Sequence, residues 1–306
     1  MRPHLILACA ALLALPACNR LPTHARVDAA IAPLIPGDTV ILAGLRLDRL
    51  KDTPFFKTYV QGRRLPDLDN FKEKTGLDPL AGIWELVYSA TPQRTLLFIR
   101  GKFGGQFGLE PNFAAPGLQR MSHKGYYILY KGADGVLFLN SGVAVAGKIL
   151  DLQALVDNRD KNSEQPPLEL LDLVKTLPAD HAWLVSSQAG VMAQKLPGEG
   201  NAGNFARLAK TLGRVTLHAD LATSVKLEAE GEYPAPELAR QVQDTLRAGI
   251  GILRLRTPDA QAEMLKVYDG IRVQARENRI TITVDAPFTA IDAFLKSQRP
   301  ASTNPK

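Results

Sequence analysis

Ser224-Val-Lys-Leu-Glu-Ala-Glu-Gly231 decides the fold class, because apolar and charged side chains alternate in it without a break. Every second side chain of such a strand lies on the same face, so this pattern predicts one packed face and one wet face. The same alternation returns in residues 271–276 and 280–284. Half-packed strands are typical of antiparallel sheets. We therefore predict an antiparallel sheet whose polar face stays in solvent through Lys226, Glu228, Arg272 and Thr281.

Helices that could cover the packed face follow in the sequence. An apolar stripe with a spacing of four residues begins after Pro234 and Pro236, and this spacing predicts an amphipathic helix. The residues of the stripe are Leu238, Val242, Leu246 and Ile250. Thr257-Pro258-Asp259 predicts the start of another helix, with a cap, a proline at the first position and an acid in the first turn.

The strands expected earlier in the chain have a different pattern. Residues 84–88, 95–99, 126–130, 136–139 and 143–146 are apolar at both even and odd positions. Strands of this kind are usually covered on both sides. Ala133-Asp134-Gly135-Val136 predicts a hairpin turn between two of them.

Short sequence words occur twice and indicate a tandem duplication. Pro36-Gly-Asp38 and Pro178-Ala-Asp180 each precede an apolar strand, and Asn70-Phe71 and Asn204-Phe205 each begin an amphipathic helix. Hairpins are predicted to start at Gly125 and Gly270. The expected fold class is α+β, with two tandem pseudo-repeat units, each an antiparallel sheet with helices packed mainly on one face.

The predicted domain boundaries follow from these repeats and from a polar stretch at residues 157–167. Residues 1–17 are expected to form a signal peptide, and residues 18–35 a tether with one short helix at 27–32. The first unit then spans 36–160, a linker and helix 161–177, the second unit 178–298 and a flexible tail 299–306.

The N-terminus has the features of a secretory signal. Arg2 precedes an apolar run from Leu5 to Leu15, which is too short to cross a bilayer. Leu15-Pro16-Ala17-Cys18 resembles a lipobox, which implies a lipidated Cys18 at the mature N-terminus; the alternative is an ordinary cysteine in a simple secretion signal. Asn19 at the next position favours the outer membrane, facing the periplasm. The chain resembles the uncharacterised, duplicated lipoproteins of bacterial envelopes, a resemblance that implies no chemistry.

Composition excludes several classes of function. Cys9 and Cys18 are the two cysteines of the 306 residues, so the expected folded body has no thiol for a disulfide, a nucleophile or a thiolate metal site. The net charge is +6, but lysines and arginines are scattered among acids, which argues against nucleic-acid binding. The basic surplus could meet anionic lipid headgroups or belong to an ordinary solvated surface.

Two motifs resemble known sites and are better explained structurally. Gly198-Glu-Gly200-Asn-Ala-Gly203 has the dinucleotide-binding spacing, but Pro197 argues against the strand that must precede it, so a loop is expected. Asp67-Leu-Asp69 resembles a calcium loop, yet Phe71 replaces a ligand, and helix capping is the better account. No catalytic, cofactor-binding or metal-binding residue is assigned.

The four histidines after the signal are His24, His123, His181 and His218, and they show no metal-binding spacing. His218 and Asp220 are two residues apart on a predicted strand. They could therefore place a carboxylate beside an imidazole on the wet face. The alternative is a pair of solvated strand residues.

Aromatic and aliphatic residues of the first unit outnumber what its predicted helices can cover, which indicates a binding surface for a partner or ligand. Its candidate residues are Trp84, Leu86, Tyr88, Phe98, Tyr127 and Leu129. The alternative is an ordinary core between sheet and helices. We expect a non-enzymatic envelope lipoprotein that binds a protein partner or an apolar ligand. An envelope hydrolase with an unrecognised site and a structural accessory subunit are the alternatives.

Overall fold

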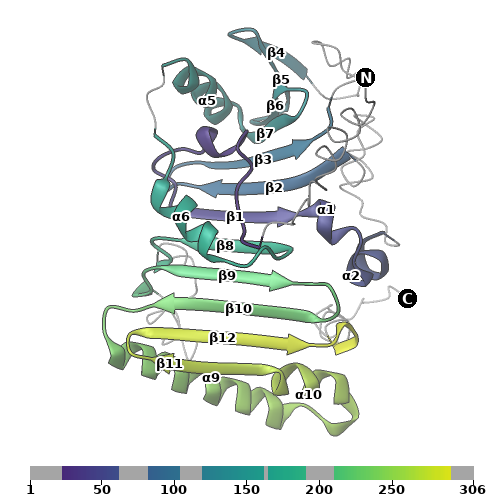
Figure 1. The fold of residues 1–306 in the computed structure, drawn as a ribbon, viewed down its shortest axis with the longest axis vertical. Helices are drawn as coiled ribbons and strands as arrows, with labels where there is room; N and C mark the ends of the chain where they lie inside the picture. Colours follow the sequence, from purple (N-terminus) through teal and green to yellow (C-terminus); the bar gives the residue numbers. More distant parts are fainter. Residues whose placement is uncertain (1–22, 62–81, 104–118, 162–164, 191–209, 291–306) are drawn as a thin grey trace, which may run out of the picture.

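The protein is built around one antiparallel sheet of twelve strands, in the order β11-β12-β10-β9-β8-β1-β2-β3-β7-β6-β5-β4 (Figure 1). The computed structural model describes residues 23–61, 82–103, 119–161, 165–190 and 210–290. Helices lie on both faces of the sheet, so the mixed α+β class is confirmed.

The strands of the first half are β1 Ile41–Arg46, β2 Ile83–Ala90, β3 Thr95–Gly101, β4 Gln119–His123, β5 Tyr126–Lys131, β6 Asp134–Asn140 and β7 Val143–Lys148. The strands of the second half are β8 Ala182–Ser186, β9 Val215–Asp220, β10 Val225–Glu232, β11 Ile271–Arg276 and β12 Arg279–Ala286. The main helices are α1 Leu47–Leu50, α2 Pro54–Phe56, α5 Ile149–Lys161, α6 Leu168–Thr176, α9 Pro236–Arg256 and α10 Ala262–Asp269.

The two halves are joined by the pairing of β1 with β8, which we call the seam. Gly44 lies opposite Trp183 in this pairing, and Leu42 lies opposite Val185. A Cβ at position 44 would collide with the indole of Trp183, so glycine allows the ring to lie across β1. The two predicted units therefore share a single sheet, a point on which the sequence left both arrangements open.

The first half packs its core on the face of the sheet that carries α5 and α6, which we call the α6 face. Phe98 of β3, Val145 of β7 and Leu152 of α5 meet there and are fully buried. The expected tether contributes to this core, because Ile31 and Ile35 are buried as deeply. Residues 27–32 do not form the predicted helix; instead a turn leads into a short 3-10 helix, Ala32–Leu34.

The second half packs on the opposite face, the α9 face. The stripe of α9 meets Val273 of the edge strand β11 and Ile280 of its neighbour β12, as its spacing predicted. The helix expected at Thr257 is displaced. The hydroxyl of Thr257 donates to the carbonyl of Leu253, and after one 3-10 turn the helix α10 begins at Ala262.

The predicted wet face is confirmed. Lys226, Glu228 and Arg272 are exposed on the α6 face of the second half, and Thr281 is half-buried there. No described helix covers β10, β12 and β11 on this side (Figure 1). The sheet therefore changes from packed to open along one face, where β8 meets β9.

The predictions for the strands of the first half are mostly confirmed, and several other predictions fall on residues that the structure does not describe. The five apolar strands of the first half are confirmed, but their hairpin turns at Gly132-Ala133, so that Asp134 and Gly135 belong to β6. The helices predicted from Asn70 and Asn204 lie outside the described residues, as do the loops at 67–69 and 198–203. None of the described helices is both long and apolar enough to span a bilayer.

Candidate functional site

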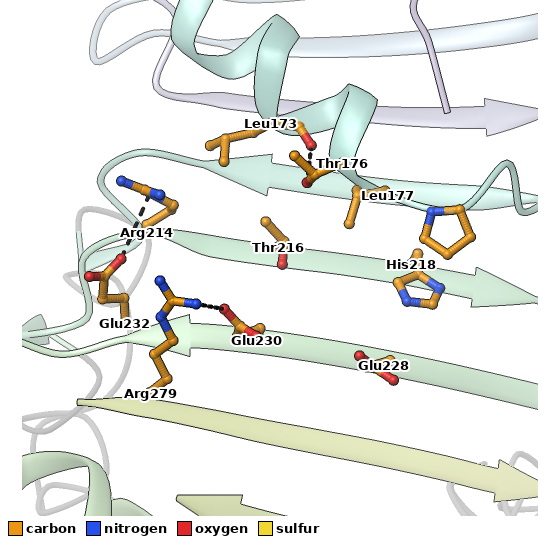
Figure 2. Close-up of a pocket in the computed structure, with 11 residues that line it drawn as sticks. Leu173, Thr176, Leu177, Arg214, Thr216, His218, Glu228, Glu230, Glu232 and Arg279 are labelled. Atoms are coloured by element: carbon orange, nitrogen blue, oxygen red, sulfur yellow. Dashed lines mark hydrogen bonds and ion pairs between the residues drawn. The ribbon is translucent and has the colours of Figure 1, made fainter. Parts of the chain in front are cut away.

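A groove of about 530 Å³ lies on the α6 face where the sheet becomes open (Figure 2). Its floor consists of side chains from β9 and β10 that alternate toward this face, among them Thr216, His218, Glu228 and Glu230. Its volume falls within the range of small-ligand sites. We take it as the candidate functional site.

The wall of the groove comes from the end of α6 and the residues that follow it. Leu173 and Leu177 supply the apolar part of this wall (Figure 2), and Pro178 also lines the groove. The helix ends here because Leu177 has extended backbone geometry, which leads the chain into β8. Since α6 packs mainly over β8, the floor from β9 onward stays open.

An aspartate–histidine pair lies at one end of the groove. Nδ1 of His218 is 2.7 Å from Oδ2 of Asp180, and both side chains are about one-fifth exposed. The predicted partner, Asp220, is instead 3.2 Å from Nδ1 of His181. The pairing of His218 with Asp220 is therefore wrong, because Asp180 reaches β9 from the chain that enters β8.

Two ion pairs lie at the other end. Arg279 is 3.3 Å from Glu230, and Arg214 is 3.8 Å from Glu232. These side chains are one-third to one-half exposed, so each pair adds little to stability. Glu228 faces His218 across the β9–β10 pairing, and within the described part of the chain it has no ion pair.

The carboxylates of this site outnumber its guanidinium groups. Asp180 and three glutamates stand against Arg214 and Arg279, in a chain whose net charge is +6. A carboxylate without a cationic partner accepts hydrogen bonds from an amine or a guanidinium. The groove is thus suited to a positively charged ligand that lies along β10.

Catalysis would require a further group beside His218. The contact with Asp180 fixes the orientation of the ring and leaves Nε2 on the groove side. In the residues that the structure describes, no hydroxyl or thiol is bonded to this nitrogen. Likewise, no three or more His, Cys, Asp or Glu side chains of the described chain are grouped as metal ligands would be.

The six residues of the predicted apolar surface do not form one open surface. Phe98 is fully buried on the α6 face, so its assignment to the surface is wrong. Trp84 lies at a β-bulge between Ile83 and Glu85, and its ring centre is 5.4 Å from Cζ of Arg100. The sequence could not predict this bulge, because the strand has apolar residues at both even and odd positions and its pattern does not show where the alternation shifts.

The other four residues lie on the α9 face. Leu86 packs against the cluster of Leu47, Leu50 and Phe56 beneath α1 and α2. Leu129 is 6% exposed, and Tyr127 lies under the guanidinium of Arg120 at 4.9 Å. Tyr88, 40% exposed, is the one large apolar side chain of the six that remains open to solvent. The apolar surface is therefore smaller than the sequence indicated.

A buried carboxylate was missed by the sequence analysis. Glu85 is 2% exposed on the α6 face, and its Oε1 has no hydrogen-bond partner. Its neighbours across the sheet are Arg46 on β1 and Arg100 on β3. Arg100 also forms an ion pair with Asp28 at 3.1 Å, which holds the N-terminal segment against the sheet.

Comparisons with known proteins identify a related fold but no family. No protein family and no curated protein matches the chain. Crystal form III of a protein designated TP0453 is similar with a TM-score of 0.55 and 9% identity, over 87% of this chain and 97% of that one. Crystal form I of TP0453 gives 0.49 with 8% identity, over 87% and 96% of the two chains. At this identity the likeness concerns the fold alone.

Proposed function

We propose that the protein is a lipid-anchored, non-enzymatic binding protein of the bacterial envelope, and that the groove over β9 and β10 receives a positively charged segment of a protein partner. The observation that carries this proposal is the surplus of carboxylates in a groove open to solvent. Three glutamates follow one another at alternate positions of β10, a repeat of roughly 6.8 Å along a strand. An extended basic segment repeats its side chains at the same interval.

The proposed anchor places this groove near the membrane. Ala179, beside the groove wall, donates its N–H to the carbonyl of Thr23, where the described chain begins. Four residues lie between Cys18 and Thr23, and the five steps from one to the other span at most roughly 17 Å. If Cys18 carries the lipid and Asn19 directs the protein to the outer membrane, the groove lies close to the periplasmic surface of that membrane.

Titration of the full-length protein with pentalysine tests the groove directly. We expect binding that weakens with salt, and about fivefold weaker binding for Glu228→Gln because one charge-assisted contact is lost. Asp172→Asn on the exposed side of α6 is the matched control. Equal affinity in all three proteins, or no binding, would overturn the assignment. Native mass spectrometry of protein extracted from its own membrane would then show whether a subunit or a lipid is retained.

The pair of Asp180 and His218 favours a hydrolase as the second candidate. A carboxylate that orients an imidazole is the arrangement of a general base. A screen with activated esters would support this candidate if the purified protein turned over a substrate and His218→Ala abolished the turnover. Without turnover in the wild type, the binding function stands alone.

We also infer a tandem duplication. The order β1-β2-β3-β7-β6 in one half corresponds to β8-β9-β10-β12-β11 in the other, with β4 and β5 as an additional hairpin. A pseudo-twofold axis through the seam, perpendicular to the sheet, would relate the two sets of strands. It would also relate the repeated words at Asp38 and Asp180. In this correspondence the hairpin from Gly270 matches β6–β7 rather than the hairpin from Gly125.

A further inference from the structure

The two edge strands of the sheet, β11 and β4, differ in the hydrogen bonding of their outward-facing backbone groups. At β11, the outward carbonyl of Val273 accepts hydrogen bonds from Nε and Nη2 of Arg247 at 3.0 and 2.7 Å. The outward N–H of Ala275 donates to Oε1 of Gln243 at 2.6 Å. Both side chains belong to α9, so this helix closes the edge as well as covering the face. Edges closed in this way do not pair with another strand.

Among the described residues, nothing pairs with the outer edge of β4. Its hairpin with β5 turns through Lys124 and Gly125, both with positive φ, and closes at the pair of His123 and Tyr126. Hydrogen-bonded pairs alternate from this closing pair, so Arg120 and Ser122 direct their backbone N–H and C=O groups away from β5. Both residues are exposed, and no backbone partner of either occurs in the described part of the chain.

We propose that β4 pairs antiparallel with β4 of a second copy of this chain, about a twofold axis at Met121. In this register Arg120 exchanges two backbone hydrogen bonds with Ser122 of the second copy, and the symmetric pair does the same. Four hydrogen bonds then join the four outward-facing N–H groups to the four outward-facing carbonyls. The two sheets become one continuous sheet.

The side chains of β4 favour a second copy over an unrelated strand. Met121 ends the apolar row that continues through Ile128 and Leu137 on the α6 face, so an apolar residue must stand opposite it. The second copy supplies its own Met121 there. Arg120 meets Ser122, and Gln119 meets His123, so no like charges are directly opposed. Arg120 is also drawn over its own Tyr127.

A cysteine at the axis tests the register. In the full chain carrying Cys9→Ser and Cys18→Ser, Met121→Cys introduces the only thiol. The two Cα atoms of this non-hydrogen-bonded pair would lie about 4.5 Å apart, within the range of a disulfide. We expect an oxidised dimer for Met121→Cys and none for the control Arg120→Cys, whose thiol faces a serine. Equal cross-linking of both variants, or of neither, would overturn the proposal.

Sedimentation of the full chain in detergent supplies an independent measurement. Ser122→Pro removes an outward N–H without touching β5 and should weaken the dimer at least about tenfold, whereas Ser122→Ala should not. Salt should strengthen the dimer, since Arg120 and Lys124 bring like charge to both sides. A monomer at every concentration would overturn the proposal. A complex with a different protein that Ser122→Pro abolishes would assign the edge to that protein instead.

Discussion

Glu85 on β2 and Arg46 on β1 stand directly opposite each other in the sheet, yet Arg46 donates its side-chain hydrogen bonds to Asp48. Glu85 is thus buried with Oε1 unpaired. Burial raises the pKa of Glu85 from 4.5 to about 7, although the charge of Arg46 opposes this shift. The carboxyl group is therefore neutral in the folded protein below neutral pH.

The pH dependence of stability should reveal this group. Because the pKa is higher in the folded state, Glu85 stabilises the fold fully below pH 4.5, and this contribution is lost as the pH rises through 7. Relative to Glu85→Gln, the wild type should lose about 3 kcal/mol of unfolding free energy between pH 4.5 and 8. Denaturant unfolding at several pH values measures the difference. Glu228→Gln, exposed on β10, is the control, and a difference between wild type and Glu85→Gln that is independent of pH would contradict the prediction.

The seam should be sensitive to one methyl group. Gly44→Ala places a Cβ against the buried indole of Trp183 and should lower the unfolding free energy by about 1–3 kcal/mol. Gly249→Ala is the matched control, since nothing lies within contact distance of its added Cβ on α9. That substitution should stabilise the helix by about 0.5–1 kcal/mol. Effects of the same sign at both positions would argue against the close approach at the seam.

The closed edge should depend on Arg247. Arg247→Ala leaves the carbonyl of Val273 without its side-chain donors and should lower stability by about 1–3 kcal/mol. The variant should also self-associate at lower concentration, because the edge of β11 becomes available for pairing. Thermal unfolding and light scattering measure the two effects. Arg240→Ala on the same helix, an exposed position, should change neither; if it does, the cause is the lost charge rather than the edge.

The proposed anchor has a direct test. Cys18 is the residue proposed to carry the acyl chains, and stable attachment requires two or more of them. Cys18→Ser should therefore release the protein from membranes or block its processing. Cys9→Ser, within the expected signal peptide, should leave membrane fractionation unchanged. A Cys18→Ser protein that is processed and still sediments with membranes would place the anchor elsewhere.

Strands β9 to β12 could be predicted from the sequence because each of them has one polar face. Alternation in residues 224–231 determines which side chains meet α9, and the structure agrees. In the first half both parities are apolar, so the face of Phe98 and the bulge at Trp84 left no sequence signal. These positions depend on pairing between strands, which no single segment encodes.

The candidate site was predictable only in part. The wet face and the position of His218 on it followed from alternation, but the partner of His218 comes from a segment 38 residues earlier in the chain. The groove itself exists because α6 stops over β8, a consequence of helix length and packing rather than of a motif. The burial of Glu85 likewise follows from the strand pairing that surrounds it.

The pairing of β1 with β8 also determines how late in synthesis the sheet can be completed. During synthesis β1 finds β2 early, but β8, its other neighbour in the sheet, emerges only after all seven strands of the first half. Until then Ile41 and Leu42 lie on an unpaired apolar edge, which is a site for aggregation of the nascent chain. Closing this edge requires a contact between residues 43 and 184, and such distant contacts form slowly. The protein is therefore at its greatest risk of misfolding before its last five strands have been synthesised.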